Sequence, residues 1–71
     1  MEIILNGEKY SPLEDNITVE DLIKEISIKW NIDLSSAVVL VNDEIVKKND
    51  WKIKKIGNKY HLEVLSFVSG G

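Results

Sequence analysis

The chain has 71 residues, a net charge of −3 at pH 7, 44% hydrophobic and 30% charged residues. A domain of this size buries about 60% of its unfolded surface, close to the lower limit for an independent core. The absence of cysteine excludes disulfide bonds, thiolate metal sites and thiol nucleophiles. Because no apolar run of about 18 residues and no basic-then-apolar leader is present, we expect a cytoplasmic protein without a membrane association.

The first predicted element is a β-hairpin over residues 2–11. Asn6-Gly7 is the strongest hairpin signal in the chain, because Asn and Gly tolerate the positive φ that a type I′ turn needs at both central residues. Residues 8–11 form the return strand, and Pro12 ends it.

An amphipathic helix is predicted next, beginning after Thr18. Thr18 is a favourable N-cap, and Glu20 and Asp21 place negative charge in the first turn. Ile28 lies opposite the apolar stripe, so we expect either that the helix ends before it or that it packs beneath a loop. The apolar stripe, which we expect to face the core, consists of Val19, Leu22, Ile23, Ile26 and Trp30.

Residues 37–46 predict a second hairpin. The continuous apolar run over residues 37–41 is typical of a strand that is covered on both faces or that carries a binding patch. Asn42-Asp43 forms the turn, residues 47–59 form a polar connection, and residues 61–68 form the last strand.

The element order β-β-α-β-β-β predicts the α+β class and a ubiquitin-like β-grasp. In this fold one helix covers one face of a mixed sheet of roughly four or five strands. The first and last strands are expected to be parallel and central. We expect one domain over residues 1–68 and a flexible tail over residues 69–71.

The tail, Ser69-Gly70-Gly71, is the first candidate site. Two glycines have little to gain from packing, and an extended tail reaches roughly 10 Å beyond the last strand. It presents the α-carboxylate of Gly71, whose reference pKa of about 3.3–3.7 keeps it ionised at neutral pH. Because the two terminal glycines have no side chains, this end of the chain can enter a narrow slot, which suits an enzyme that acts on the Gly71 carboxylate. A frayed terminus or a glycine scar is the alternative interpretation.

An uncovered apolar patch beside the tail is the second candidate site, because the first and last strands carry apolar residues on both faces. Such patches on a small domain are typical of partner surfaces. The alternative is a bulge that returns Leu65 or Phe67 to the core. The candidate residues for partner binding are Ile4, Leu40, Leu65, Phe67 and Val68.

No pattern indicates catalysis by the chain itself. The sequence contains neither a P-loop nor a G-x-G-x-x-G pattern, and its one histidine, His61, has no cysteine or histidine cluster around it. The lysines between residues 47 and 59 favour a solvated or enzyme-docking face over a nucleic-acid site, since the whole chain is acidic. We therefore expect no bound cofactor, no metal and no nucleic acid, and chemistry carried out on the chain by another enzyme.

The whole chain resembles the ThiS family of sulfur carrier proteins of thiamine biosynthesis, relatives of the molybdopterin synthase small subunit and of ubiquitin. The sequence departs from the family pattern at Lys47, where proline is common. It also departs at residues 58–60, where an Asp-Gly-Asp turn is common. The resemblance rests on Asn6-Gly7, Thr18-Val19-x-x-Leu22-Ile23, Val41-Asn42-Asp43-Glu44-Ile45-Val46 with Trp51, and Phe67-Val68-Ser69-Gly70-Gly71.

This resemblance implies that a ThiF-like adenylating enzyme uses ATP and magnesium to convert the Gly71 carboxylate into an acyl-adenylate. A sulfur donor then displaces AMP, and the resulting thiocarboxylate is delivered to a ThiG-like thiazole synthase. Three alternatives stay open: a carrier of the molybdopterin synthase type, a ubiquitin-like modifier joined through Gly71 to lysines, and an interaction module whose tail is idle.

Overall fold

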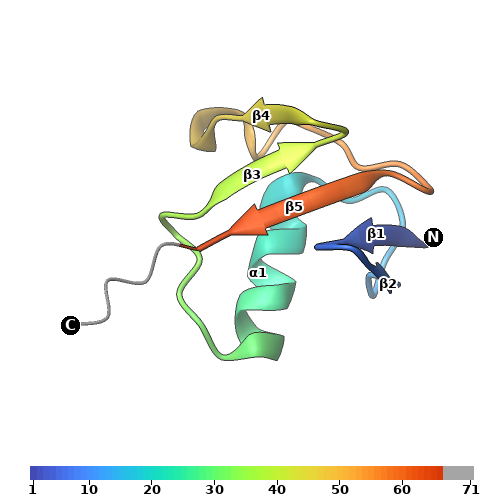
Figure 1. Cartoon of the computed structure of the whole chain (residues 1–71), viewed down its shortest axis with the longest axis horizontal. Helices are drawn as coiled ribbons and strands as arrows, with labels where there is room; N and C mark the ends of the chain where they lie inside the picture. Colours follow the sequence, from blue (N-terminus) through green and yellow to red (C-terminus); the bar gives the residue numbers. More distant parts are fainter. Residues whose placement is uncertain (67–71) are drawn as a thin grey trace.

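A mixed sheet forms one layer of the molecule, and a helix packed across one of its faces forms the other (Figure 1). The structure is a computed structural model that describes residues 1–66, so predictions for residues 67–71 lie outside the described residues. The elements are β1 (Ile3–Leu5), β2 (Glu8–Tyr10), α1 (Val19–Trp30), β3 (Val38–Val41), β4 (Glu44–Val46), the short 3-10 helix η1 (Lys48–Asp50) and β5 (His61–Leu65).

The sheet has five strands in the order β2-β1-β5-β3-β4. Strands β1 and β5 are parallel neighbours, with Ile4 paired to His61 and Leu5 paired to Leu62. The other three strand pairs are antiparallel. The predicted β-grasp, with the first and last strands parallel and inside the sheet, is confirmed.

Both hairpins turn through residues with positive φ, which the sequence predicted for Asn6-Gly7. Asn6 and Gly7 have φ of 50° and 83°, and Asn42 and Asp43 have φ of 51° and 70°. Because a type I′ turn matches the right-handed twist of its strands, each hairpin keeps a fixed register. Ile4 therefore opposes Lys9 in the first hairpin.

Helix α1 begins at the predicted position. Thr18 Oγ1 accepts a hydrogen bond from the backbone N–H of Asp21 at 3.2 Å, and Asp21 Oδ2 accepts one from the backbone N–H of Thr18 at 3.0 Å. This capping box satisfies two backbone donors at the helix start. The backbone N–H of Thr18, and then its side chain, holds the pKa of the Asp21 carboxyl below its ordinary value.

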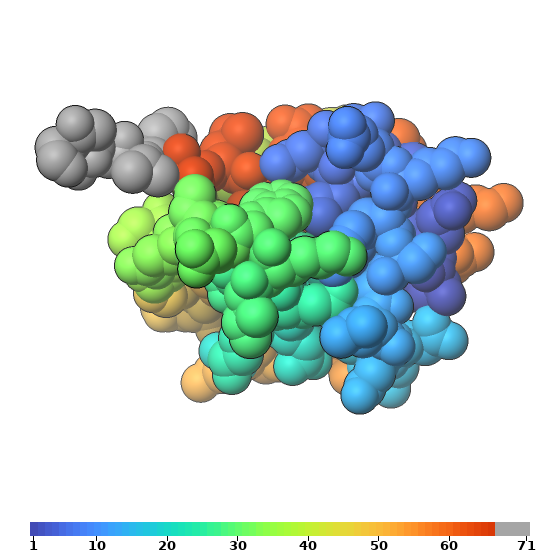
Figure 2. Space-filling view, turned by 90° about the horizontal axis from the view of Figure 1, so that it is seen from below, coloured from blue at the N-terminus to red at the C-terminus, as the bar shows by residue number. Residues whose placement is uncertain are grey.

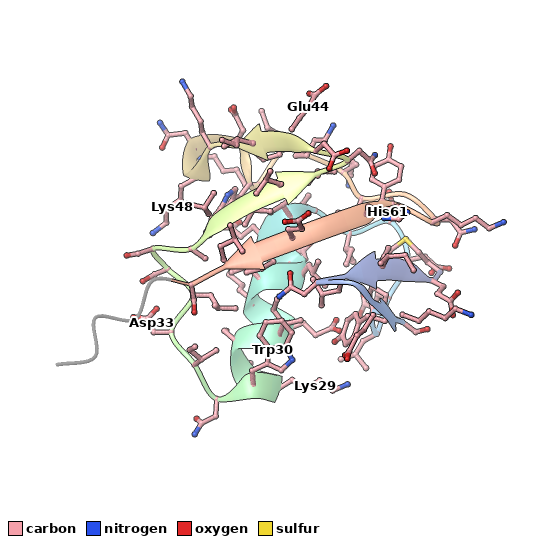
Figure 3. The ribbon with its side chains drawn as sticks, in the orientation of Figure 1. Lys29, Trp30, Asp33, Glu44, Lys48 and His61 are labelled. Atoms are coloured by element: carbon pink, nitrogen blue, oxygen red, sulfur yellow. The ribbon has the colours of Figure 1, made fainter. Side chains whose placement is uncertain are left out.

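The predicted apolar stripe is buried for its first four members and exposed at its last. Trp30 is 41% exposed, so its assignment to the core was wrong. Its direction along the helix fits the stripe, but it lies in the last turn of α1, which extends beyond the strands (Figures 1 and 3). Both expectations for Ile28 were also wrong, because the helix continues past it and its side chain is 83% exposed.

Two connections complete the core. Leu34, in the segment after α1, is 2% exposed and had no predicted role. Trp51 follows η1, and its indole N–H donates to the Val46 carbonyl at 3.0 Å. The buried hydrophobic residues are Ile3, Leu5, Ile17, Val19, Leu22, Ile23, Ile26, Leu34, Val39, Val41, Trp51, Ile56, Leu62 and Val64.

Candidate docking face and strand exit

The face of the sheet opposite α1 is left uncovered by the described residues. Successive side chains of a strand point to opposite faces, so the burial pattern of each strand identifies its outward side chains. In Figure 2 the red residues of β5 lie along the upper rim, on the side away from the cyan residues of the helix. The outward residues are Ile4 and Lys9 on the first hairpin, His61, Glu63 and Leu65 on β5, Val38 and Leu40 on β3, and Ile45 on β4.

Four of these outward residues form one apolar surface across three neighbouring strands. Leu65 pairs with Val38, and Leu40 pairs with Ile45. Side chains directly opposite each other have Cβ atoms about 5 Å apart, so each pair is in contact range. Leu65 is 43% exposed and Ile45 is 68% exposed, whereas the other two are half-buried. We call Val38, Leu40, Ile45 and Leu65 the apolar face.

The predicted patch is brought together only in part. Leu40 and Leu65 share the apolar face, and the continuous register between β3 and β5 contains no bulge that would turn Leu65 inward. Ile4 is outward and half-buried, but it pairs with His61 at the opposite end of β5. The span of β5, roughly 13 Å, therefore separates Ile4 from Leu65. Figure 3 shows His61 at that far end.

The sequence interpretation missed Val38 and Ile45. Val38 belongs to the apolar run that was assigned to a strand, and Ile45 follows the Asn42-Asp43 turn. Two-residue alternation through that turn places Ile45 opposite Leu40, so the signal was present in the hairpin pattern.

The end of β5 is held by the side chain of Asn6. Backbone groups of alternate residues point to the same neighbouring strand, and the Leu62 carbonyl accepts the Asn6 backbone N–H at 2.9 Å. The groups of Val64 point the same way, where β1 has already ended. Asn6 Oδ1 accepts the Val64 N–H at 2.8 Å, and Asn6 Nδ2 donates to the Val64 carbonyl at 3.2 Å. One asparagine side chain thus extends the β1–β5 pairing by a residue.

The start of β5 is closed in a similar way by Asn42, the first residue of the other type I′ turn. Its backbone N–H donates to the His61 carbonyl at 2.7 Å, and its Oδ1 accepts the His61 N–H at 2.9 Å. Both ends of the strand that leads to the C-terminal residues are therefore fixed by turn asparagines. Ser66 is the last described residue, and the candidates Phe67, Val68, Ser69, Gly70 and Gly71 lie outside the described residues.

Within residues 1–66, no group of three or more His, Cys, Asp or Glu side chains is arranged to hold a metal ion. In the same residues, no helix is both long and apolar enough to cross a membrane. The ion pair formed there joins the amino terminus to Asp15 at 2.8 Å, and neither residue belongs to the apolar face.

The fold and the exit strand together define a ubiquitin-like β-grasp domain whose last strand lies inside the sheet. A comparison with protein families matches residues 2–71 to the ThiS family, and the chain belongs to that family. Among solved structures, it is similar to the crystal structure of the thiamine biosynthesis protein ThiS from Geobacter metallireducens. The TM-score is 0.81 with 18% sequence identity over 100% of both chains, a likeness of fold. A search of curated proteins found no match.

Proposed function

We propose that this chain is a sulfur carrier for thiamine biosynthesis, and that its Gly71 carboxylate is converted into a thiocarboxylate. The observation that carries the proposal is the family match, which extends to residue 71 and so includes the Gly70-Gly71 pair. The chain then acts as a carrier and co-substrate, and the chemistry is performed by enzymes that bind it.

The chemistry follows from the low reactivity of a carboxylate toward nucleophiles. A Gly71 carboxylate oxygen attacks the α-phosphorus of ATP on a ThiF-like adenylating enzyme, and pyrophosphate leaves with magnesium balancing its charge. The acyl-adenylate then has a good leaving group. Hydrosulfide from a donor system attacks the acyl carbon and expels AMP, which leaves the thiocarboxylate for a ThiG-like thiazole synthase. If the donor is a persulfide, the product is an acyl disulfide, and a second thiol cleaves its S–S bond to release the thiocarboxylate and a donor disulfide.

The apolar face is the proposed contact surface for both enzymes. Leu65 and Val38 lie at the end of β5 from which the chain continues toward Gly71. An exposed apolar surface at the end of the strand that leads to the reacting residue allows an enzyme to bind the domain and the terminus together. Leu40 lies on the same surface, and Phe67 and Val68 remain proposed contacts.

Sulfur loading is tested by intact mass spectrometry after incubation with adenylating enzyme, ATP, magnesium and a sulfur source. Exchange of oxygen for sulfur resembles oxidation of Met1 in mass, so a thiol-selective alkylating reagent is added. The chain contains no cysteine, and alkylation therefore reports the thiocarboxylate. We expect one alkylated sulfur, located by fragmentation at Gly71. A stable adduct to protein lysines without sulfur loading would instead identify a modifier.

Deleting Gly71, or adding one alanine after it, is expected to abolish loading without changing thermal stability. Deletion withdraws the carboxylate by about 3.5 Å, and a misplacement of about 1 Å costs on the order of a hundredfold. Loading of either variant at the wild-type rate would contradict the proposal.

Docking is tested with Leu65→Asp and the matched variant Leu13→Asp. Leu13 is 86% exposed in the connection before α1, away from the apolar face. Because a new charge on the apolar face must be desolvated on binding, Leu65→Asp is expected to weaken binding to the adenylating enzyme, and Leu13→Asp is expected to have little effect. Circular dichroism confirms that both variants fold. Equal binding by both would exclude the apolar face as the contact surface.

A further inference from the structure

One acidic side chain lies inside the outward face that the proposed function assigns to docking. Glu63 is exposed on β5, directly opposite Leu40 on β3. It is also two residues from Leu65 along the same face, a separation of about 6.7 Å. Glu63 therefore borders two of the four residues of the apolar face.

Glu63 has no partner of opposite charge within the described residues. The ion pair found in residues 1–66 is that between the amino terminus and Asp15, and no hydrogen bond to the Glu63 carboxylate is formed there. The nearest outward neighbour on its own strand, toward the start, is His61. The carboxylate is thus stabilised by water in the free protein.

Docking over Leu40 and Leu65 removes that water. A carboxylate that loses its hydration without a compensating partner opposes binding strongly, whereas a charge pair across an interface offsets the cost and selects the partner. An entirely apolar partner surface is therefore a poor match for this face.

We propose that the enzyme surface that binds the apolar face presents a lysine or arginine to Glu63, so that Glu63 selects the partner. This inference rests on the proposed function, and it adds the chemistry of the enzyme's surface: apolar contacts around one cation. A partner with the same shape but without the cation is rejected by the unpaired carboxylate.

The test measures binding of the adenylating enzyme that loads the wild-type chain in the mass assay. Wild type is compared with Glu63→Gln and Glu63→Lys at low and physiological salt. Glu14→Gln and Glu14→Lys are matched controls, because Glu14 is exposed in the connection before α1 and gives the same changes of net charge. Circular dichroism and thermal unfolding confirm the fold of each variant.

We expect Kd to rise about tenfold for Glu63→Gln and by about a hundredfold or more for Glu63→Lys, with the Glu14 variants close to wild type. Part of the salt dependence of binding should disappear in Glu63→Gln, because one charge pair is lost.

Tighter binding by Glu63→Gln, or equal losses for the Glu63→Lys and Glu14→Lys variants, would overturn the inference. If Leu65→Asp still weakens binding in that case, the docking face stands and only the paired cation is excluded. If the wild-type chain is never loaded with sulfur, the proposed function fails, and this inference fails with it.

Discussion

Replacing Asn6 tests whether one side chain holds the end of β5. Asn6→Gly keeps the positive φ of the turn without steric cost and removes both hydrogen bonds to Val64. Asn6→Ala removes the same bonds and also forces a Cβ with an ordinary side chain into the left-handed region. Asn42→Gly is the matched control, since that residue occupies the same position in the other turn.

The expected loss follows from the bonds and their burial. Each hydrogen bond is worth about 1 kcal/mol net, and the Val64 backbone groups lie in a residue that is only 5% exposed. We expect Asn6→Gly to lower the free energy of unfolding by about 2 kcal/mol. For Asn6→Ala we expect about 3 kcal/mol, because the left-handed backbone adds about 1 kcal/mol. Asn42→Gly loses one exposed side-chain bond and should cost about 1 kcal/mol or less.

The assays are chemical denaturation, thermal unfolding and hydrogen exchange. Because 1 kcal/mol shifts Tm by roughly 4–8 °C in a domain of this size, Asn6→Gly should lower Tm by about 8–16 °C. Protection of the Val64 amide against exchange should fall more than that of Leu62. Equal stability of Asn6→Gly and Asn42→Gly, with unchanged protection at Val64, would refute the reasoning.

Three further outcomes are expected. Thr18→Ala should lower the free energy of unfolding by about 1 kcal/mol, because the capping bond to Asp21 is lost, and an unchanged denaturation midpoint would contradict this. Burial, followed by the hydrogen bond to Glu25, raises the pKa of Tyr10 from 10.0 to about 12. Because the unfolded chain releases that proton first, stability should fall as pH rises from 10 to 12, and Tyr10→Phe should remove this contribution in alkaline denaturation curves. Ile28→Lys should change stability by less than about 0.5 kcal/mol in denaturant titration, whereas a larger loss would mean that Ile28 packs against the domain.

Local signals in the sequence were sufficient to predict the two turns and the start of the helix. Asn6-Gly7, Asn42-Asp43 and Thr18 act through their own backbone geometry or that of residues nearby, so their effect is readable without knowledge of tertiary contacts. Trp30 and Ile28 failed for a different reason. Helical spacing gives the direction of a side chain but not whether another element reaches far enough to cover it.

The candidate site was predictable only where alternation alone decides orientation. The two-residue alternation of strand side chains is enough to place Leu40 and Leu65 on the outward face. The grouping of Ile4 with Leu65 was wrong, because the position of Ile4 along β5 depends on the register of the parallel pair. Register with β5 is set by contacts about 57 residues apart in the chain. The hydrogen bonds from the Asn6 side chain to the Val64 backbone depend on the same long-range register, so no local pattern in the sequence predicts them.

The two outer strands of the sheet, β2 and β4, have three residues each. Pro12 lies just beyond the first, and Lys47 and Lys48 follow the second. Short edges flanked by proline and charge are poor templates for pairing with a strand from another chain. Recognition by addition of a strand to these edges is therefore disfavoured, and copies of the domain resist joining edge to edge. The edges of this sheet therefore offer no easy strand-pairing route to association beside the exposed apolar face.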